Sequence, residues 1–99
     1  MVKLSMHLTK EVKEFVLSKQ ILRSGTSIGA DIEEANQAQS KSDFIHKLSI
    51  ALKEAAETNY WLRLLRDSKL IESKLAESFL TDCEELQKIL TASIKTSKK

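Results

Sequence analysis

The residues with the most chemistry to offer are two histidines, one cysteine and two neighbouring glutamates. Di-iron helical bundles take their metal ligands from inward-facing carboxylates and from Glu-x-x-His motifs. His46 has Asp43 three positions before it, whereas His7 has Leu4 there, so the chain holds one imperfect half-motif. We therefore expect no metal site and no bound cofactor.

The two glutamates are the best candidates for catalysis. Glu54 and Glu57 lie one helical turn apart, a spacing that suits acid–base work when burial separates the two pKa values. The sequence specifies no partner nucleophile, and pairing with Lys53 or Arg63 on a helix surface is the usual fate of such residues. Cys83 falls on an apolar stripe, where a thiol usually packs as a small hydrophobic group. We expect no catalytic residue and no enzymatic activity.

One aromatic and basic segment could contact nucleic acid. Trp61 beside Tyr60, followed by two arginines, has the composition of a surface that stacks bases and binds phosphates. Trp61 is also in register with the apolar Leu64, which favours packing at a helix interface. The cations that could contact nucleic acid are Arg63, Arg66, Lys95, Lys98 and Lys99.

The charge balance gives little support to nucleic-acid binding. The chain has 16 Lys and Arg against 14 Asp and Glu, a net charge of +2, and three of these cations are lysines in the tail. Without that +3 the remainder carries −1. Proteins that bind nucleic acid through phosphate neutralisation usually show a clustered cationic face.

Composition points to one helical domain. The 99 residues include no Pro, two Gly and 5% aromatics, whereas a β-sandwich needs frequent turn signals and many β-branched or aromatic positions. A chain of this length fits a single domain. The single cysteine cannot form an internal disulfide, and neither a leader nor a long apolar run is present. We therefore expect a cytoplasmic protein that makes no membrane contact.

The region around the two glycines shows helical periodicity. Its stripe consists of Ile21, Gly25, Ile28, Ile32, Ala35 and Gln39. Gly25 and Gly29 are one turn apart, so their missing side chains would let a neighbouring helix approach closely. The composition of residues 24–27 also fits a loop, and the pattern alone leaves both interpretations open.

The strongest structural signal begins at Phe44, after a polar segment in which Ser40 or Ser42 can cap a helix. A seam typical of a bundle helix follows, formed by Phe44, Leu48, Ala51, Ala55, Thr58, Leu62 and Leu65. A second stripe on another face contains Ile50, Glu54, Glu57, Trp61 and Leu64. Two contact surfaces are implied, so we expect the second stripe to form an oligomer interface.

The two ends of the chain are expected to differ. A short first helix, a connection and a second helix from about Val16 are predicted at the N-terminus. At the other end, Ser73 is expected to cap a last helix with apolar positions Ala76, Phe79, Cys83, Leu86 and Leu90. This helix is predicted to run to about Ile94, with residues 94–99 as a flexible Lys-rich tail. Residues 1–99 then form one elongated bundle.

Three segments carry a resemblance to a known family. They are Leu22–Ala35 (LRSGTSIGADIEEA), Ser42–Phe44 (SDF) and Lys53–Leu62 (KEAAETNYWL). The chain resembles the bacterial four-helix-bundle family first noticed as reading frames in intervening sequences of 23S ribosomal RNA genes. That resemblance implies an up-and-down antiparallel bundle, a ring-like homopentamer and no enzymatic activity. The family includes the accessory variability protein of diversity-generating retroelements, which works with a reverse transcriptase and RNA.

The resemblance also has local implications. It places Gly25 and Gly29 inside a helix. The family's first helix usually begins well before the position of Met1, so we expect a shortened first helix that leaves part of the bundle seam uncovered. The family commonly has Asn where this chain has Asp31. The match reaches Arg23, Ser27, Glu34, Phe44, Lys53, Glu54, Glu57 and Leu62.

Roles for these matched residues follow from their position. We expect Phe44 and Leu62 to lie in the core. The charged residues expected in buried or interfacial ion pairs are Arg23, Glu34, Glu54 and Glu57.

Two functions are therefore expected from the sequence. The first is a non-catalytic homo-oligomeric adaptor, a pentamer in this family, that binds RNA or a nucleic-acid enzyme. The second is a homo-oligomeric scaffold that binds another protein and makes no nucleic-acid contact.

Overall fold

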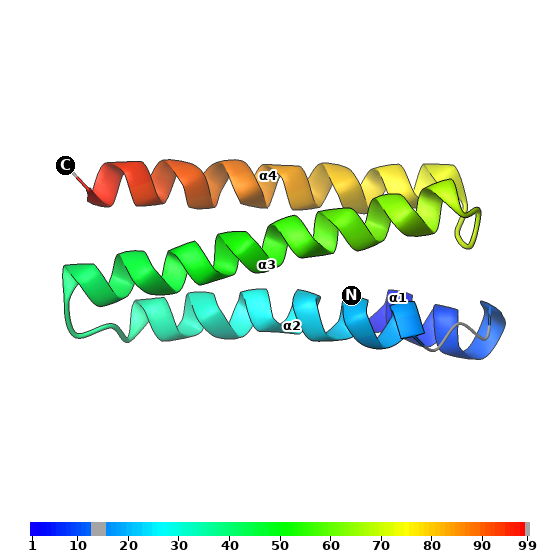
Figure 1. The fold of residues 1–99 in the computed structure, drawn as a ribbon, viewed down its shortest axis with the longest axis horizontal. Helices are drawn as coiled ribbons and strands as arrows, with labels where there is room; N and C mark the ends of the chain where they lie inside the picture. Colours follow the sequence, from blue (N-terminus) through cyan, green and yellow to red (C-terminus); the bar gives the residue numbers. More distant parts are fainter. Residues whose placement is uncertain (13–15, 99) are drawn as a thin grey trace.

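The computed structural model describes residues 1–12 and 16–98, and these residues form an elongated all-α structure measuring 45 × 19 × 15 Å (Figure 1). The helices are α1 (Val2–His7), a π-helical segment η1 (Leu8–Val12), α2 (Val16–Asn36), α3 (Lys41–Asp67) and α4 (Ser73–Ser97). The short first helix and the start of the second helix at Val16 agree with the sequence-based expectation.

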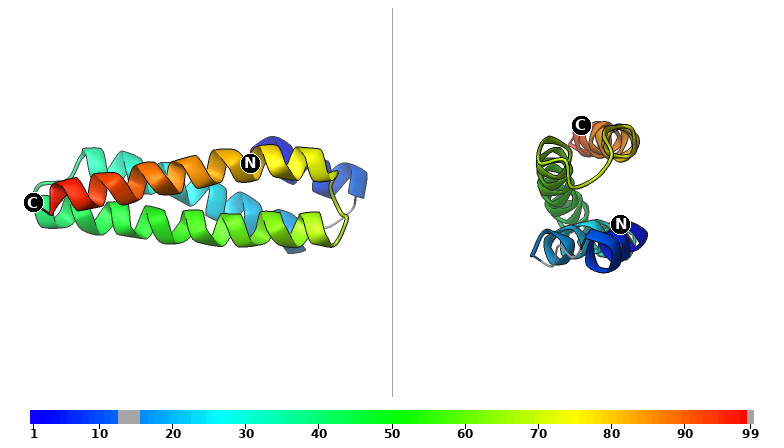
Figure 2. Two further views of the ribbon diagram at one scale, coloured as in Figure 1. Left: turned by 90° about the horizontal axis from the view of Figure 1, so that it is seen from above. Right: turned by 90° about the vertical axis from the view of Figure 1, so that its right-hand side faces the viewer.

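The helices form an antiparallel up-and-down four-helix bundle with one short member. α3 packs against both α2 and α4, and α1 packs against α2. The end-on view in Figure 2 shows the helices along an open arc, with α1 beside one end of α2. α3 therefore has a neighbour on each side. None of the helices among the described residues combines the length and the hydropathy that crossing a membrane requires.

The bounds of α3 and α4 follow from local interactions and burial. The backbone N–H of Asp43 donates to Ser40 Oγ at 3.0 Å, so Ser40 caps α3 as one of the two expected serines. Ser73 was expected to cap α4, but it is the first helical residue and Glu72 occupies the cap position without a side-chain hydrogen bond. α4 also continues to Ser97 instead of ending at Ile94, because Ile94 is buried and continues the apolar side of the helix.

The core consists of two apolar clusters, one towards each end of the bundle. The first cluster contains Leu4, Leu8, Ile21, Leu62, Leu65, Ile71, Ala76, Leu80 and Cys83. The second cluster contains Ile28, Ala35, Leu48, Ala51, Ala55, Leu90 and Ile94. α1 and η1 contribute to the first cluster, whereas α2, α3 and α4 alone supply the buried residues of the second. The second cluster is thus built from three helices.

Burial confirms the predicted seam of α3 and the helical interpretation of the glycine region. Six of the seven seam positions are buried and the seventh, Phe44, is half-buried. Gly25 and Gly29 both lie inside α2, so the loop interpretation of residues 24–27 was wrong. The reason is that Ser24 is fully buried and Thr58 Oγ1 donates a hydrogen bond to its side chain, which accommodates a polar residue within the helix.

Hydroxyl groups and two leucines fix α1 and η1 against α2. Ser5 Oγ and Ser18 Oγ are 2.8 Å apart, and Thr9 Oγ1 is 2.8 Å from the same Ser18 oxygen. Leu4 and Leu8 are buried beside them. These contacts set the register in which Met1 lies against Gly25.

Candidate functional site

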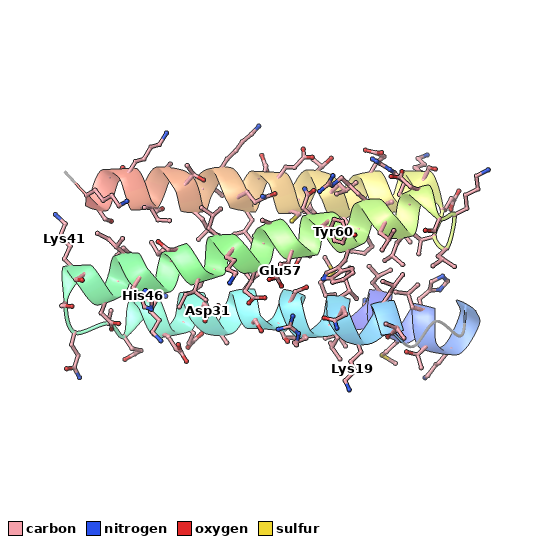
Figure 3. The ribbon with its side chains drawn as sticks, viewed as in Figure 1. Lys19, Asp31, Lys41, His46, Glu57 and Tyr60 are labelled. Atoms are coloured by element: carbon pink, nitrogen blue, oxygen red, sulfur yellow. The ribbon has the colours of Figure 1, made fainter. Side chains whose placement is uncertain are left out.

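The second stripe predicted on α3 is a surface of intermediate burial. Its five residues, called the α3 stripe below, are each half-buried in the single chain: Ile50, Glu54, Glu57, Trp61 and Leu64. The stripe lies towards α2, since Arg23 of α2 comes within 3.5 Å of Glu57. Figure 3 shows Glu57 on α3 and Asp31 on α2 along the boundary between these two helices.

Polar atoms in and beside the α3 stripe lack partners. Glu54 Oε2, Trp61 Nε1 and Asp31 Oδ2 are shielded from solvent without a hydrogen-bond partner among the described residues. Shielded polar groups are normally hydrogen-bonded, because an unpaired one forfeits its hydration without compensation. In the isolated chain these three polar atoms at the boundary between α2 and α3 therefore lack hydrogen bonds that would offset their loss of hydration.

Trp61 combines packing with partial exposure. It packs against the first core cluster, and its ring meets that of Tyr60 edge-on with the centroids 5.1 Å apart. Tyr60 itself is exposed. Part of the indole of Trp61 thus packs in the core, and the rest contributes apolar surface to the α3 stripe.

Two ion pairs connect α2 with α3 at the surface. Lys47 Nζ is 2.9 Å from Glu34 Oε2, and Arg23 Nη2 is 3.5 Å from Glu57 Oε2. The hydrogen bond and the charge of Glu34 raise the pKa of Lys47 above its ordinary value. Because both pairs are substantially exposed, water screens them and each adds little stability.

The two glycines have different surroundings. A Cβ atom on Gly25 would come within 2.7 Å of Met1 Cβ, so α1 and α2 meet closely there. A Cβ atom on Gly29 would meet nothing within 4 Å. The close contact expected at Gly29 is absent from the described chain, because α1 runs antiparallel to α2 and reaches only Gly25.

A hollow of about 280 Å³ opens at this point between α2 and α4. It is lined by Met1, Gly25, Ile28, Thr58, Phe79, Asp82, Cys83 and Leu86. The thiol and the hydroxyl that line it already form hydrogen bonds within the chain. Cys83 Sγ donates to Ala55 O at 3.2 Å. Thr58 Oγ1 lies 2.9 Å from both Glu54 O and Ser24 Oγ. Burial raises the pKa of the Cys83 thiol, which disfavours the nucleophilic thiolate. The hollow is an apolar gap in the bundle seam.

The cationic candidates do not converge on one surface. Arg66 donates to Asp67 at 3.0 Å and to Glu77 at 2.9 Å, so two carboxylates offset its charge. Arg63 is exposed, donates to Asn59 and lies 5.9 Å from the Tyr60 ring centre.

Lys95 and Lys98 lie at the C-terminal end of α4, which Figure 1 shows at the opposite end of the molecule from the turn between α3 and α4. Lys95 and Lys98 are exposed, and Lys99 lies outside the described residues. Lys95 borders a shallow depression on α4 that is lined by Gln87, Lys88, Thr91, Ala92 and Lys95. We call this surface the α4 depression.

No metal-binding arrangement exists in the part of the chain that the structure describes. There, no group of three or more His, Cys, Asp or Glu side chains could hold a metal ion. His7 and His46 are both exposed.

Sequence reasoning missed two features of these surfaces. One is the α4 depression, whose polar lining gives no signal of its own in the sequence. The other is the buried hydroxyl pair of Ser24 and Thr58. Ser24 lies three positions after Ile21 and four before Ile28, so helical spacing could have placed it among the buried residues.

Comparisons with known proteins agree with this architecture. The family model described as 23S rRNA-intervening sequence protein matches residues 1–92. The chain is 58% identical to a protein of unknown function from the S23 ribosomal protein family of Bacteroides thetaiotaomicron VPI-5482, known from a crystal structure. The two superpose with a TM-score of 0.94 over 95% of this chain and 87% of that chain. None of the curated proteins compared with the chain matches it.

Proposed function

Because the chain belongs to the 23S rRNA-intervening sequence protein family, we propose that it is a non-catalytic adaptor built from a homo-oligomeric helical bundle. Five copies form a ring, and the partner is RNA or a nucleic-acid enzyme. A relation to the accessory variability protein of diversity-generating retroelements belongs to the same proposal. The ring and the partner come from the family resemblance, and the surface of this chain supports self-association.

The observation that carries the proposal is the α3 stripe. Ile50, Trp61 and Leu64 present half-buried apolar surface along one side of α3, outside the core seam. Glu54 and Trp61 each leave a shielded polar atom unpaired there. Monomeric proteins seldom leave contiguous apolar patches of large size uncovered. A second copy of the chain would cover this stripe.

Mass measurement tests self-association. We expect the parent protein to elute above one-chain mass in size-exclusion chromatography with light scattering. Trp61→Ala should lower that mass, or raise the concentration needed for assembly, more than it lowers helix content. Leu75→Ala is a matched control because Leu75 is a large exposed apolar residue in the first turn of α4, outside the α3 stripe and away from the α4 depression. A parent protein at one-chain mass throughout the micromolar range would exclude the oligomer, and a dimer would exclude the ring.

A second measurement tests the nucleic-acid partner. Exposed Arg63, Lys95 and Lys98 are the described cations that support RNA contact. Binding through phosphates weakens steeply as salt rises. We therefore expect filter-binding titrations with structured RNA to give much weaker affinity at 200 mM than at 50 mM salt. Absence of binding at low salt would remove direct RNA contact from the proposal.

The alternative function is a homo-oligomeric scaffold for another protein, without nucleic-acid contact. This function is favoured because Arg66, one of the candidate phosphate-binding cations, already donates hydrogen bonds to Asp67 and Glu77, whose negative charges offset its own. Co-purification from the native host distinguishes the two functions, since the adaptor should recover RNA or a nucleic-acid enzyme and the scaffold should recover neither.

A further inference from the structure

We infer that the contact between copies joins two unlike, oppositely charged surfaces: the α3 stripe of one copy docks on the α4 depression of the next. This inference rests on the proposed homo-oligomer and specifies which surfaces meet. Its partner is a second copy of this chain, and charge complementarity selects it.

The α3 stripe supplies the acidic and apolar side of the contact. Glu54 of α3 and Asp31 of α2 each have one carboxylate oxygen shielded and unpaired, and Glu57 has only a long, exposed pair with Arg23. A partly desolvated carboxylate gains from a cation brought close by a partner. The apolar surface of Trp61 and Ile50 would lose its water in the same contact.

The α4 depression supplies the basic side. Lys88 and Lys95 flank it and are exposed, and none of the ion pairs among the described residues includes either lysine. Glu84 and Glu85 lie four and three positions before Lys88, and neither forms an ion pair with it among the described residues. Thr91 and Ala92 give the depression short side chains, which leaves room for a larger side chain from a neighbour. The depression is therefore a shallow surface with room for a side chain between two exposed cations that form no ion pair among the described residues.

The positions of the two surfaces require a head-to-tail contact. The α3 stripe lies towards α2, whereas the depression lies on α4, which packs against another side of α3. Pairing two α3 stripes would bring carboxylates together, and pairing two depressions would bring lysines together. Contacts between unlike surfaces generate rings when the rotation closes.

Charge reversal on each surface, followed by reversal on both, tests the contact. The first variant carries Glu54→Lys and Glu57→Lys, the second carries Lys88→Glu and Lys95→Glu, and the third carries all four changes. A control with Lys69→Glu and Lys74→Glu reverses two exposed lysines outside both surfaces. Circular dichroism reports helix content, and light scattering reports mass as a function of concentration at low salt.

We expect each single-surface variant to need at least about tenfold more protein for assembly, because like charges then face each other. The four-change variant should recover assembly near the parent concentration, and the control should match the parent. The second variant tests the contact even if the first unfolds, because Lys88 and Lys95 are exposed. An oligomeric parent whose assembly survives the second variant would overturn this contact and leave the proposed oligomer standing. A parent at one-chain mass would overturn both.

Discussion

At the scale of single residues, similar side chains differ because of what lies beside them. Gly25 and Gly29 are one turn apart in α2, yet Met1 covers the first and nothing within 4 Å covers the second. Ser24 is fully buried, and Thr58 supplies the hydrogen bond that its hydroxyl needs there. Ser27, three residues later in the same helix, is only half-buried. The chemistry of each residue thus depends on a neighbour that is distant in sequence.

The glycines allow a matched stability test. Gly29→Ala should raise the free energy of unfolding by about 0.5–1 kcal/mol, because alanine favours a helix and its Cβ meets no atom. Gly25→Ala must displace Met1, so we expect no gain there, and Gly25→Leu should lose about 1–3 kcal/mol through overpacking. Urea denaturation followed by circular dichroism measures all three. Equal gains from alanine at both positions would contradict the close contact between Gly25 and Met1.

Cys83 predicts a pH dependence of stability. Burial, with a smaller contribution from the charge of Glu84, raises the pKa of the folded thiol above its ordinary value of 9.0. The unfolded chain therefore loses this proton first as the pH rises. The stability that Cys83 contributes is complete below pH 9 and declines as the pH rises through the folded pKa.

Cys83→Ala is the reference for this measurement. We expect the parent to be more stable than Cys83→Ala at pH 7, and the difference in unfolding free energy to narrow from pH 9 to pH 10.5. Urea titrations under reducing conditions give both values. A difference that stays constant over this range would show that burial does not hold the thiol protonated.

At the scale of elements, α3 organises the molecule. It is the longest helix, packs against α2 and α4, and carries both the core seam and the α3 stripe. Its start depends on Ser40, whose side chain accepts the hydrogen bond from the Asp43 backbone N–H. Asp43 adds a negative charge to the first turn, where the helix dipole favours one.

The Ser40 cap can be tested directly. Ser40→Ala should lower the free energy of unfolding by about 1 kcal/mol, the usual cost of losing a serine cap. Ser42→Ala is the control, because Ser42 is exposed in the first turn and does not occupy the cap position. Equal effects of the two changes in urea denaturation would show that the cap adds no stability.

At the scale of the whole molecule, the core is unevenly covered. The first core cluster receives residues from α1 and η1, and the second receives its buried residues from three helices only. Gly29 and the hollow beside Met1 lie at and beyond the end of the short helix α1. Contacts between copies would thus add stability to a bundle that is open along one edge.

Self-association predicts that stability depends on concentration. Assembly stabilises the folded chain by mass action, so the melting temperature should rise as protein concentration increases. Scanning calorimetry at 5, 50 and 500 µM measures the shift, and Trp61→Ala should reduce it. A melting temperature that does not change over this range would indicate that folding and assembly are not coupled.

The helical class and the core seam of α3 could be predicted from the sequence because helical periodicity is local, and the expected role of the α3 stripe as an oligomer interface stays a prediction. Leu48, Ala51 and Ala55 recur at three- and four-residue spacing, and one turn of helix brings each onto the same side whatever the partner is. Ser40 as a cap is local for the same reason, since its partner Asp43 is three residues away. The helix ends at Ser73 and Ile94 were less predictable, because burial of Ile94 extends α4.

Only the tertiary structure decided which residues of different helices contact each other. Thr58 meets Ser24 across 34 positions, and Arg66 meets Glu77 across the turn between α3 and α4. Gly25 is covered by Met1 and Gly29 is not, and this difference likewise depends on how far α1 extends along α2. Each of these contacts requires the axial register of two helices, which arises from the packing of many apolar side chains together. Periodicity within one helix specifies which face is buried, whereas this register determines which residue of the neighbouring helix it meets.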